Sequence, residues 1–228
     1  MVNYEVDAAL LRPFVPRGTE LDTWKGSSFV SLVAFRFLDT RVLGLPIPLH
    51  RDFAEVNLRF YVRRVLGSEL RRAVVFLREV VPRRTIVAVA RWVYNEPYVA
   101  SPTRGQVAPT PPPSVEYAWR LKGAWHTCAA KARLPGSVPE PQTLEAFIIE
   151  HHWGYTRQRD GGTIEYRVEH PRWTAWLVAD FRLQADVASL CGPELGAALV
   201  QPRSVLIADG SPVRVFWPQR GVASAAAG

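Results

Sequence analysis

The segment FAEVNLRFYVRR, residues 53–64, alternates between two kinds of side chain. One set is wholly apolar: Val56, Leu58, Phe60 and Val62. The other set can form hydrogen bonds or ion pairs at every position: Glu55, Asn57, Arg59 and Tyr61. Successive side chains of a β-strand point to opposite faces of its sheet. The segment is therefore predicted to be a strand with one apolar and one polar face, which favours a sheet protein.

The rest of the chain carries the patterns of several more strands and a few short helices. Alternation predicts strands at 27–42, 70–81 and 173–183, and hairpins that turn at 67–68, 122–123, 160–162 and 209–210. Helical spacing predicts short helices at 7–11 and 141–150 and a broken one at 186–199, while the rest of 1–24 has no regular pattern. About nine strands with so few helices imply a mainly β (α+β) fold, a curled or closed and mostly antiparallel sheet.

The segment between Pro82 and Pro97 fits two descriptions. Its β-branched residues are typical of a strand, whereas Ile86, Val89, Ala90 and Val93 recur at helical spacing. Because a proline commonly stands at the start of a helix, we predict a helix that ends before Pro97.

The length and composition suit one domain over residues 1–228, although 228 residues would also accommodate two small ones. A Pro-rich loop at 101–114 is the only candidate linker, and strand-like patterns resume on both sides of it. A flexible C-terminal tail is expected from about residue 219. No apolar stretch approaches the roughly 20 residues of a membrane helix, and no signal peptide is visible. Cys128 and Cys191 are isolated, as in a cytoplasmic protein with reduced thiols.

The net charge of +7 raises the question of nucleic acid. Of the 28 basic residues only Lys25, Lys122 and Lys131 are lysines, and the arginines are scattered without a run of five like charges. This distribution disfavours a nucleic-acid partner. No glycine-rich phosphate loop or dinucleotide fingerprint appears either, so no cofactor is expected.

Several segments together resemble the YqjF-like bacterial family of unknown function. These are residues 21–48, FAEVNLRFYVRR, EHHWGY at 150–155 and EYRVEHPRW at 165–173. That family is grouped with the acetoacetate decarboxylase-like superfamily. The resemblance implies a closed β-barrel-like sheet with short flanking helices and an interior pocket. It implies the fold more firmly than any activity.

The resemblance also exposes one chemical departure. The decarboxylases carry Arg-Glu followed shortly by Pro-Lys-Lys, and one of these lysines forms a Schiff base. The similar run here is REVVPRR, residues 78–84, with Arg83 and Arg84 where the lysines would stand. A guanidinium stays protonated and is no nucleophile. Decarboxylation through an imine is therefore disfavoured.

The polar face of 53–64 has two interpretations. In an ordinary sheet its Glu and Arg would pair weakly in water. In the barrel that the resemblance implies, this face would point inward. Glu55 would then act as an acid or base, Arg59 would clamp a carboxylate, and Asn57 and Tyr61 would orient the ligand.

Other charged residues add candidates to that site. Glu79 is a second candidate acid or base, and Arg83 or Arg84 at the start of the predicted helix would suit an anion. Arg91 follows two turns along the same helical face. The alternative is a structural ion-pair network, which we favour for three neighbouring arginines: Arg71, Arg72 and Arg78.

The adjacent histidines His151 and His152 do not form a metal motif. On a strand they would face opposite ways, and no HxH or HExxH spacing exists, so no metal site is expected. We expect one of them to be packed and the other to line the pocket as a proton carrier; the sequence leaves open which one points inward, and His152 is taken as the candidate ligand-binding residue.

The sequence thus predicts a protein that binds a small anionic carboxylate molecule, with lyase- or hydrolase-like acid/base chemistry by Glu55 or Glu79. The alternative is a ligand sensor or interaction protein without turnover.

Overall fold

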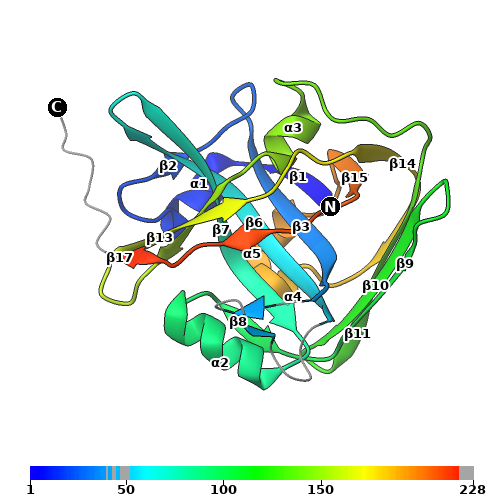
Figure 1. The fold of residues 1–228 in the computed structure, drawn as a ribbon, viewed down its shortest axis with the longest axis horizontal. Helices are drawn as coiled ribbons and strands as arrows, with labels where there is room; N and C mark the ends of the chain where they lie inside the picture. The colour runs from blue at the N-terminus through cyan, green and yellow to red at the C-terminus, as the bar shows by residue number, and fades with distance from the viewer. Residues whose placement is uncertain (40, 43–44, 47–51, 221–228) are drawn as a thin grey trace.

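The computed structural model describes residues 1–39, 41–42, 45–46 and 52–220 of the chain. Most strands belong to one sheet (Figure 1), which runs in the order β16 (Arg214–Val215), β13 (Thr163–Glu169), β12 (Trp153–Arg157), β7 (Glu69–Val81), β6 (Phe53–Leu66), β3 (Ser28–Phe37), β1 (Val2–Val6), β15 (Ser204–Ala208), β14 (Ala175–Gln184), β11 (Ala124–Ala132), β10 (Ser114–Leu121) and β9 (Thr103–Ala108). Three short strands pair beside this path: β17 (Gln219–Arg220) with β13, β2 (Glu20–Leu21) with β6, and β8 (Tyr98–Ala100) with β7. A separate ladder joins β4 (Arg41–Val42) to β5 (Leu45–Pro46).

The hairpin β6–β7 is formed by the two longest strands of the sheet. It confirms the predicted strand and turn. The two strands pair antiparallel from Leu66↔Glu69 to Val56↔Val80. Gly67 takes a positive φ of 59° at the turn, which a residue without a Cβ adopts without strain. A register shift at Leu58/Arg59 marks a β-bulge, and bulges bend a strand and increase its twist.

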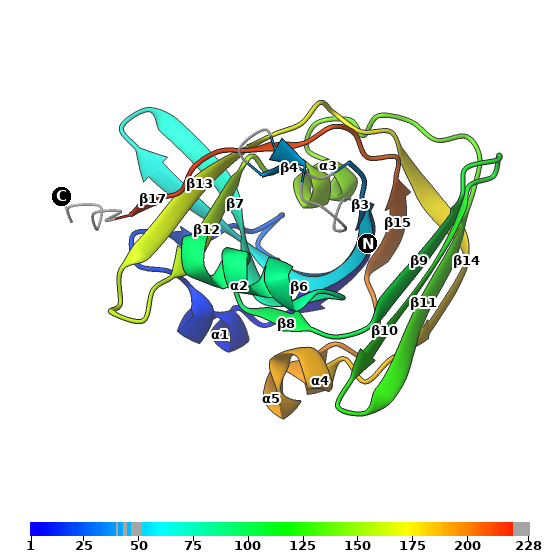
Figure 2. The same ribbon diagram turned by 60° about the horizontal axis from the view of Figure 1, so that its bottom comes forward.

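The sheet is mostly antiparallel, as predicted, but its closure into a barrel is not confirmed. The pairing path of the described strands has two ends, β16 and β9, which are not paired with one another. Figure 2 shows β3 and β6 curving beneath α3 (Leu144–Ile149), with β9 to β11 set apart at the other end of the path. The start of β9 lies against β6, where Thr103 Oγ1 donates to Ala54 O at 2.7 Å.

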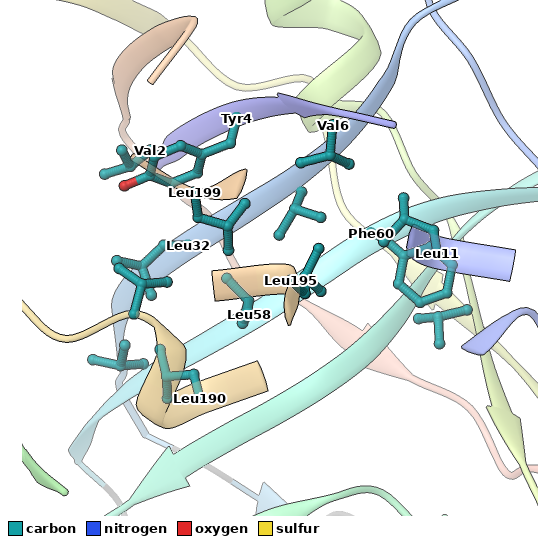
Figure 3. Packing of buried hydrophobic residues seen from close by; sticks show 14 of the residues in the cluster. Val2, Tyr4, Val6, Leu11, Leu32, Leu58, Phe60, Leu190, Leu195 and Leu199 are labelled. Carbon is teal, nitrogen blue, oxygen red and sulfur yellow. The ribbon is translucent and has the colours of Figure 1, made fainter. Parts of the chain in front are cut away.

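The apolar face of β6 forms the main core. Leu58 and Phe60 are fully buried there against residues of β1 and β3. Three short helices cover this face: α1 (Ala8–Leu11), which continues as the 3-10 helix η1 (Arg12–Phe14), α4 (Ala188–Cys191) and α5 (Pro193–Ala198). Figure 3 shows Leu190, Leu195 and Leu199 meeting these strands. The predicted apolar face and the broken helix are both confirmed.

The other face of the same strands is covered by α3, the helix predicted at 141–150. Its N-cap Thr143 accepts a hydrogen bond from Ala146 N at 3.2 Å, which satisfies one free donor of the first turn. Phe147 and Ile148 of α3 are buried against Phe29 and Tyr61. Both faces of β6 are therefore buried, which is unusual for a strand that alternates so clearly.

The ambiguous segment after Pro82 forms the helix α2 (Arg84–Val93), as predicted. The chain then returns through residues 94–97 and enters β8, which pairs parallel with β7 at Glu79↔Tyr98 and Val81↔Ala100. This β7–α2–β8 crossover brings the chain back alongside β7. Residue Glu96, just before β8, is brought beside Glu79 in this way.

Four sequence expectations are corrected, wholly or in part, by long-range pairing. The lead-in contains β1, which pairs with β3 and β15 near the middle of the sheet. The last predicted hairpin does not form, because β15 pairs with β1 and β14 while β16 pairs with β13. Within 101–114, residues 103–108 form β9, since no proline interrupts them and their backbone groups pair with β10. At the C-terminal end Gln219 and Arg220 pair with β13, and residues 221–228 lie outside the described residues.

The two faces of the hairpin predict different tolerance to truncation. Leu58→Ala, at a fully buried position, should lower the free energy of unfolding by about 2–5 kcal/mol because it leaves a cavity. Leu70→Ala on β7, where the side chain is 53% exposed, should change it by less than about 0.5 kcal/mol. Urea unfolding of both variants measures this, and equal losses would contradict the placement of the core.

Candidate functional site

The polar face of β6 is buried rather than solvated. Glu55 is 1% exposed, Asn57 2% and Tyr61 1%. Burying a charged or amide side chain is unfavourable unless partners replace the lost water. The solvated interpretation is therefore wrong for these three residues, and the structure must provide another reason for them.

Two further carboxyl groups lie beside Glu55. Glu79 of β7 stands opposite Asn57 in the β6–β7 register, and it is 2% exposed. Glu96, at the end of the α2–β8 connection, is 4% exposed. These three side chains, Glu55, Glu79 and Glu96, are called the carboxyl cluster below. They come from three separate segments of the chain, so the cluster is a product of the tertiary fold.

Hydroxyl and amide groups supply part of the hydrogen bonding. Asn57 Nδ2 donates to Glu55 Oε1 at 3.0 Å, and Tyr98 OH donates to Glu55 Oε2 at 3.3 Å. Glu96 Oε1 accepts from two hydroxyl groups. They are Thr156 Oγ1 of β12 at 2.5 Å and Tyr166 OH of β13 at 2.9 Å.

Gly154 makes room for Tyr166. A Cβ at position 154 would lie 2.1 Å from Tyr166 Cζ, well inside contact distance. The absence of a side chain at Gly154 therefore lets the Tyr166 ring lie across β12 and reach Glu96. Position 154 is a glycine for this reason of space.

Two oxygens of the carboxyl cluster and one of the adjacent Asn57 are buried without a hydrogen bond to any described residue. They are Asn57 Oδ1, Glu79 Oε2 and Glu96 Oε2. More than nine in ten buried polar groups in proteins have a partner. Three exceptions in one place mark a region whose hydrogen bonding is incomplete.

The electrostatics of the cluster follow from burial and mutual repulsion. Desolvation raises the pKa of Glu55 to about 7, against the lowering effect of its hydrogen bonds and of Arg59. Desolvation likewise raises the pKa of Glu96 to about 8, with the charge of Glu55 adding to it. The pKa of Glu79 is raised well above its usual range by desolvation and by the charges of Glu96 and Glu55. All three groups thus hold protons at higher pH than ordinary carboxyls do.

A fourth buried carboxylate, Glu165, shows what a structural ion pair looks like in the same fold. Arg71 Nη1 lies 2.6 Å from Glu165 Oε1 and Arg64 Nη1 lies 3.2 Å from Glu165 Oε2. Tyr155 OH also donates to this carboxylate. No such ion pair joins the carboxyl cluster to any described cationic side chain. Both oxygens of Glu165 thus have partners, whereas Glu79 Oε2 and Glu96 Oε2 have none among the described residues.

The arginines favoured as structural are indeed engaged elsewhere. Arg71 pairs with Glu165, and Arg72 Nε lies 2.7 Å from Asp22 Oδ2. Arg78 Nε donates to Leu190 O at 3.3 Å. The expected structural ion pairs are thus present for Arg71 and Arg72, whereas the hydrogen bond given for Arg78 goes to a backbone carbonyl.

Arg59 is the cation that shares the polar face of β6 with the cluster. Its Nη2 donates to Ile148 O of α3 at 3.3 Å, and its guanidinium lies 5.8 Å from the centre of the Tyr61 ring. Its buried Nε has no hydrogen-bond partner among the described residues. Arg59 therefore retains a free donor on the face that also carries Glu55.

Tyr61 is held in a buried polar chain beyond Arg59. Its OH lies 2.6 Å from Ser31 Oγ, which donates to Asn3 Oδ1 at 2.7 Å. The ring of Tyr61 lies 4.6 Å from that of His151. These contacts hold the Tyr61 side chain in place beside Arg59.

The structure does not bring the other predicted residues to the cluster. Arg83 and Arg84 are exposed at the start of α2. The side chain of Arg91 lies outside the described part of the chain. His152 is exposed and stacks on His170, with ring centres 4.7 Å apart.

The buried histidine of the adjacent pair is His151. Burial lowers its pKa well below the usual value, with the charges of Arg72 and Arg59 adding to the effect, so its ring is neutral. The assignment of the inward role to His152 is therefore wrong, because the chain at 151–152 precedes β12 and does not follow strand alternation.

Sequence reasoning missed Glu96, Tyr98, Thr156 and Tyr166. One signal existed, since Tyr94, Glu96 and Tyr98 stand at every second position after the helix ends at Val93. That spacing is typical of an extended segment with one side turned toward a common region.

Two further findings concern metal binding and membrane-spanning helices. Among the described residues, no three His, Cys, Asp or Glu side chains are placed to hold one metal ion. None of the described helices has the length and apolar character needed to cross a membrane.

The raised pKa values predict how stability depends on pH. Between about pH 4.5 and pH 7 the unfolded chain releases the Glu55 proton while the folded chain keeps it, so stability falls as pH rises, by roughly 3 kcal/mol for this group. Glu55→Gln removes this titration and should flatten the dependence. Urea unfolding between about pH 5 and pH 8 measures it. Glu116→Gln, at an exposed position on β10, is the control and should behave as wild type; an identical slope in Glu55→Gln would contradict the assignment.

Comparisons with known proteins agree with this architecture. A profile of the DUF2071 family, described as "Uncharacterized conserved protein", matches residues 1–212. The uncharacterized protein YqjF of Bacillus subtilis (strain 168) is 26% identical over 222 residues, which cover 96% of this chain and 87% of YqjF.

Two solved structures show the shared fold. Acetoacetate decarboxylase from Legionella pneumophila superposes with a TM-score of 0.64 at 12% identity, over 96% of this chain and 82% of that one. The enduracididine biosynthesis enzyme MppR complexed with pyruvate superposes with a TM-score of 0.56 at 13% identity, over 96% and 83%. The fold is acetoacetate decarboxylase-like, and the chain belongs to the DUF2071 family.

Proposed function

We propose that the protein binds a small organic acid on the polar face of β6, between Arg59 and the carboxyl cluster, and transfers a proton to or from it. The curved sheet then serves as an incomplete barrel whose inner side carries the site. The observation that carries this proposal is the joint burial of Glu55, Glu79 and Glu96 beside an arginine with a free donor.

Arg59 supports the carboxylate half of the proposal. A guanidinium is always charged and presents several N–H donors in a fixed plane, which suits a carboxylate. Here only Nη2 has a hydrogen bond to a described residue, and that acceptor is a neutral backbone carbonyl. A ligand carboxylate would give this cation its counter-charge. The anion-binding role thus falls to Arg59 and not to the exposed Arg83 and Arg84.

Glu55 supports the proton-transfer half. A general acid or base works best when its pKa is near the working pH. The pKa of Glu55, raised to about 7, leaves both of its protonation states populated near neutral pH. Burial and the neighbouring acids raise the pKa of Glu79 well above its usual range, so it suits the role of a neutral donor to a developing negative charge.

A Schiff base on a lysine is not part of the proposal. Lys25, Lys122 and Lys131 are all exposed. A nucleophilic lysine needs an apolar or cationic environment that depresses its pKa, and an exposed ammonium has none. The chemistry proposed here is therefore acid/base chemistry of the lyase or hydrolase kind, without an imine.

The ligand class gains support from the fold neighbours. The MppR structure contains pyruvate, a small keto acid. A shared fold does not by itself transfer a ligand, but it makes small carboxylic and keto acids the first compounds to test.

Binding is tested by thermal unfolding with a panel of small carboxylic and keto acids, pyruvate included. An acid at a hundredfold excess over its Kd should stabilise the wild type by about 2.7 kcal/mol. Arg59→Gln should weaken binding by about tenfold or more, because the charged partner is lost. Arg63→Gln is the matched control on the same strand, with a side chain 42% exposed, and should bind as wild type.

The outcomes separate the alternatives. A stabilising acid that works equally well on Arg59→Gln would place the ligand elsewhere. A panel without any stabilising acid would contradict the proposal.

Catalysis is tested on any acid that binds. Glu55→Gln should lower turnover by about a hundredfold or more, the usual contribution of a positioned acid or base, while leaving binding largely intact. Product formation followed by NMR measures turnover. Binding without consumption by the wild type would identify a ligand sensor instead of an enzyme.

A further inference from the structure

We infer that the ligand of this site carries an organic cation, an ammonium or guanidinium group, which the carboxyl cluster binds while Arg59 binds the ligand's carboxylate. The inference rests on the proposed function and narrows its substrate class from organic acids to acids that also bear a cationic nitrogen.

The unfilled hydrogen-bonding capacity is the first step. Asn57 Oδ1, Glu79 Oε2 and Glu96 Oε2 are buried, and none has a partner within the described residues. An amide oxygen accepts hydrogen bonds and cannot donate them, and each carboxyl of the cluster becomes an acceptor only once it ionises, which a bound cation favours. What would complete this region is therefore a group with several N–H donors. Ammonium carries three donors and a guanidinium up to five.

The charge of the cluster is the second step. Glu165 is balanced by two arginines in the same fold, whereas no described cationic side chain forms an ion pair with Glu55, Glu79 or Glu96. An uncompensated group of buried acids stays protonated, and each added charge repels the next. A bound cation reverses this preference, because an opposite charge nearby favours the ionised carboxylate.

The shape of the site is the third step. Three suitable side chains of the described residues do not converge on a point where one metal ion would sit. The carboxyls approach instead from β6, from β7 and from the α2–β8 connection. A flat or tetrahedral cation with separated N–H groups fits such spread acceptors better than a compact ion does.

The strand sets the length of the ligand. Asn57 and Glu55 lie two and four residues from Arg59 on β6, which is about 7 to 13 Å along a strand. A carboxylate and a nitrogen at opposite ends of a short aliphatic chain match this spacing. The ligand class is thus a short ω-amino or ω-guanidino acid.

Binding of such a ligand moves a proton. The cation enters with its own proton, since an alkylammonium has a pKa of about 10.4. One carboxyl of the cluster ionises and releases its proton to solvent. Affinity should therefore rise with pH through the range in which Glu55 and Glu96 titrate, about 7 and about 8. The polar groups that face this event are Glu55, Asn57 and Arg59 of β6, Glu79 of β7, Glu96 before β8, Tyr98 of β8, Thr156 of β12 and Tyr166 of β13.

The experiment is calorimetric titration of the full chain with matched probes. The cationic probes are γ-aminobutyrate, ε-aminocaproate and γ-guanidinobutyrate. Butyrate and caproate are the corresponding acids without the nitrogen group, and butylamine is the corresponding amine without the carboxylate. At least one amino or guanidino acid should bind about tenfold or more tightly than its plain acid. Its binding in two buffers of different ionisation enthalpy should release up to one proton near neutral pH.

Variants assign the effect to the cluster. Glu79→Gln and Glu96→Gln should each lower the ratio of the affinity for the cationic probe to the affinity for its plain acid by about tenfold or more. Each replaces a buried acid by a neutral amide of similar shape, and thermal unfolding checks that the variants are folded. Glu116→Gln on the exposed side of β10 is the control and should keep the preference.

Each result has one meaning. Equal or tighter binding of the plain acids would overturn this inference and leave the proposed function standing. A preference that survives in both variants would also overturn it. Butylamine binding that is insensitive to Arg59→Gln, with no binding of any plain acid, would keep the cation site and contradict the carboxylate half of the proposed function. No binding of any probe would overturn both.

Discussion

The arrangement of this protein depends on a strand that is buried on both faces although only one of them is apolar. The apolar face of β6 packs on the helices α1, α4 and α5, as alternation requires. The polar face lies under α3 and beside α2, away from water. Burying carboxyl groups opposes folding, so the main core must supply the free energy that holds them there. The buried carboxyl groups therefore lower the free energy of unfolding.

The contrast between Glu165 and Glu79 separates structure from function within one molecule. Both are buried carboxyls on adjoining parts of the sheet. Glu165 has two arginines and a tyrosine around it, and this arrangement ties β7 to β13. Glu79 has like charges for neighbours. The partners of Glu165 account for its burial. A buried acid beside other acids has no such structural explanation, and groups of this kind are commonly found at functional sites.

The sequence predicted what depends on local pattern and missed what depends on distant pairing. Alternation located β6 and β7 and identified Glu55 and Asn57, while Glu79 was a candidate from the run REVVPRR. It could not place Glu96, whose position is set by the parallel pairing of β8 with β7 after a whole helix. Nor could it choose between His151 and His152, because both precede the first residue of β12. The segments on either side of Asp209–Gly210 do not pair with one another, because β15 pairs with β1 and β14 while β16 pairs with β13.

The crossover β7–α2–β8 has a consequence for how the site responds to its surroundings. Glu79 belongs to a long strand in the middle of the sheet, whereas Glu96 lies between α2 and the short β8, where Thr156 and Tyr166 donate hydrogen bonds to it. A ligand that binds Glu96, as proposed, would therefore favour the arrangement in which α2 and β8 are in place. Thermodynamic linkage then requires that occupancy of the site and attachment of α2 strengthen one another by the same free energy. If the proposed ligand binds, a contact that holds α2 in place would raise its affinity without touching it.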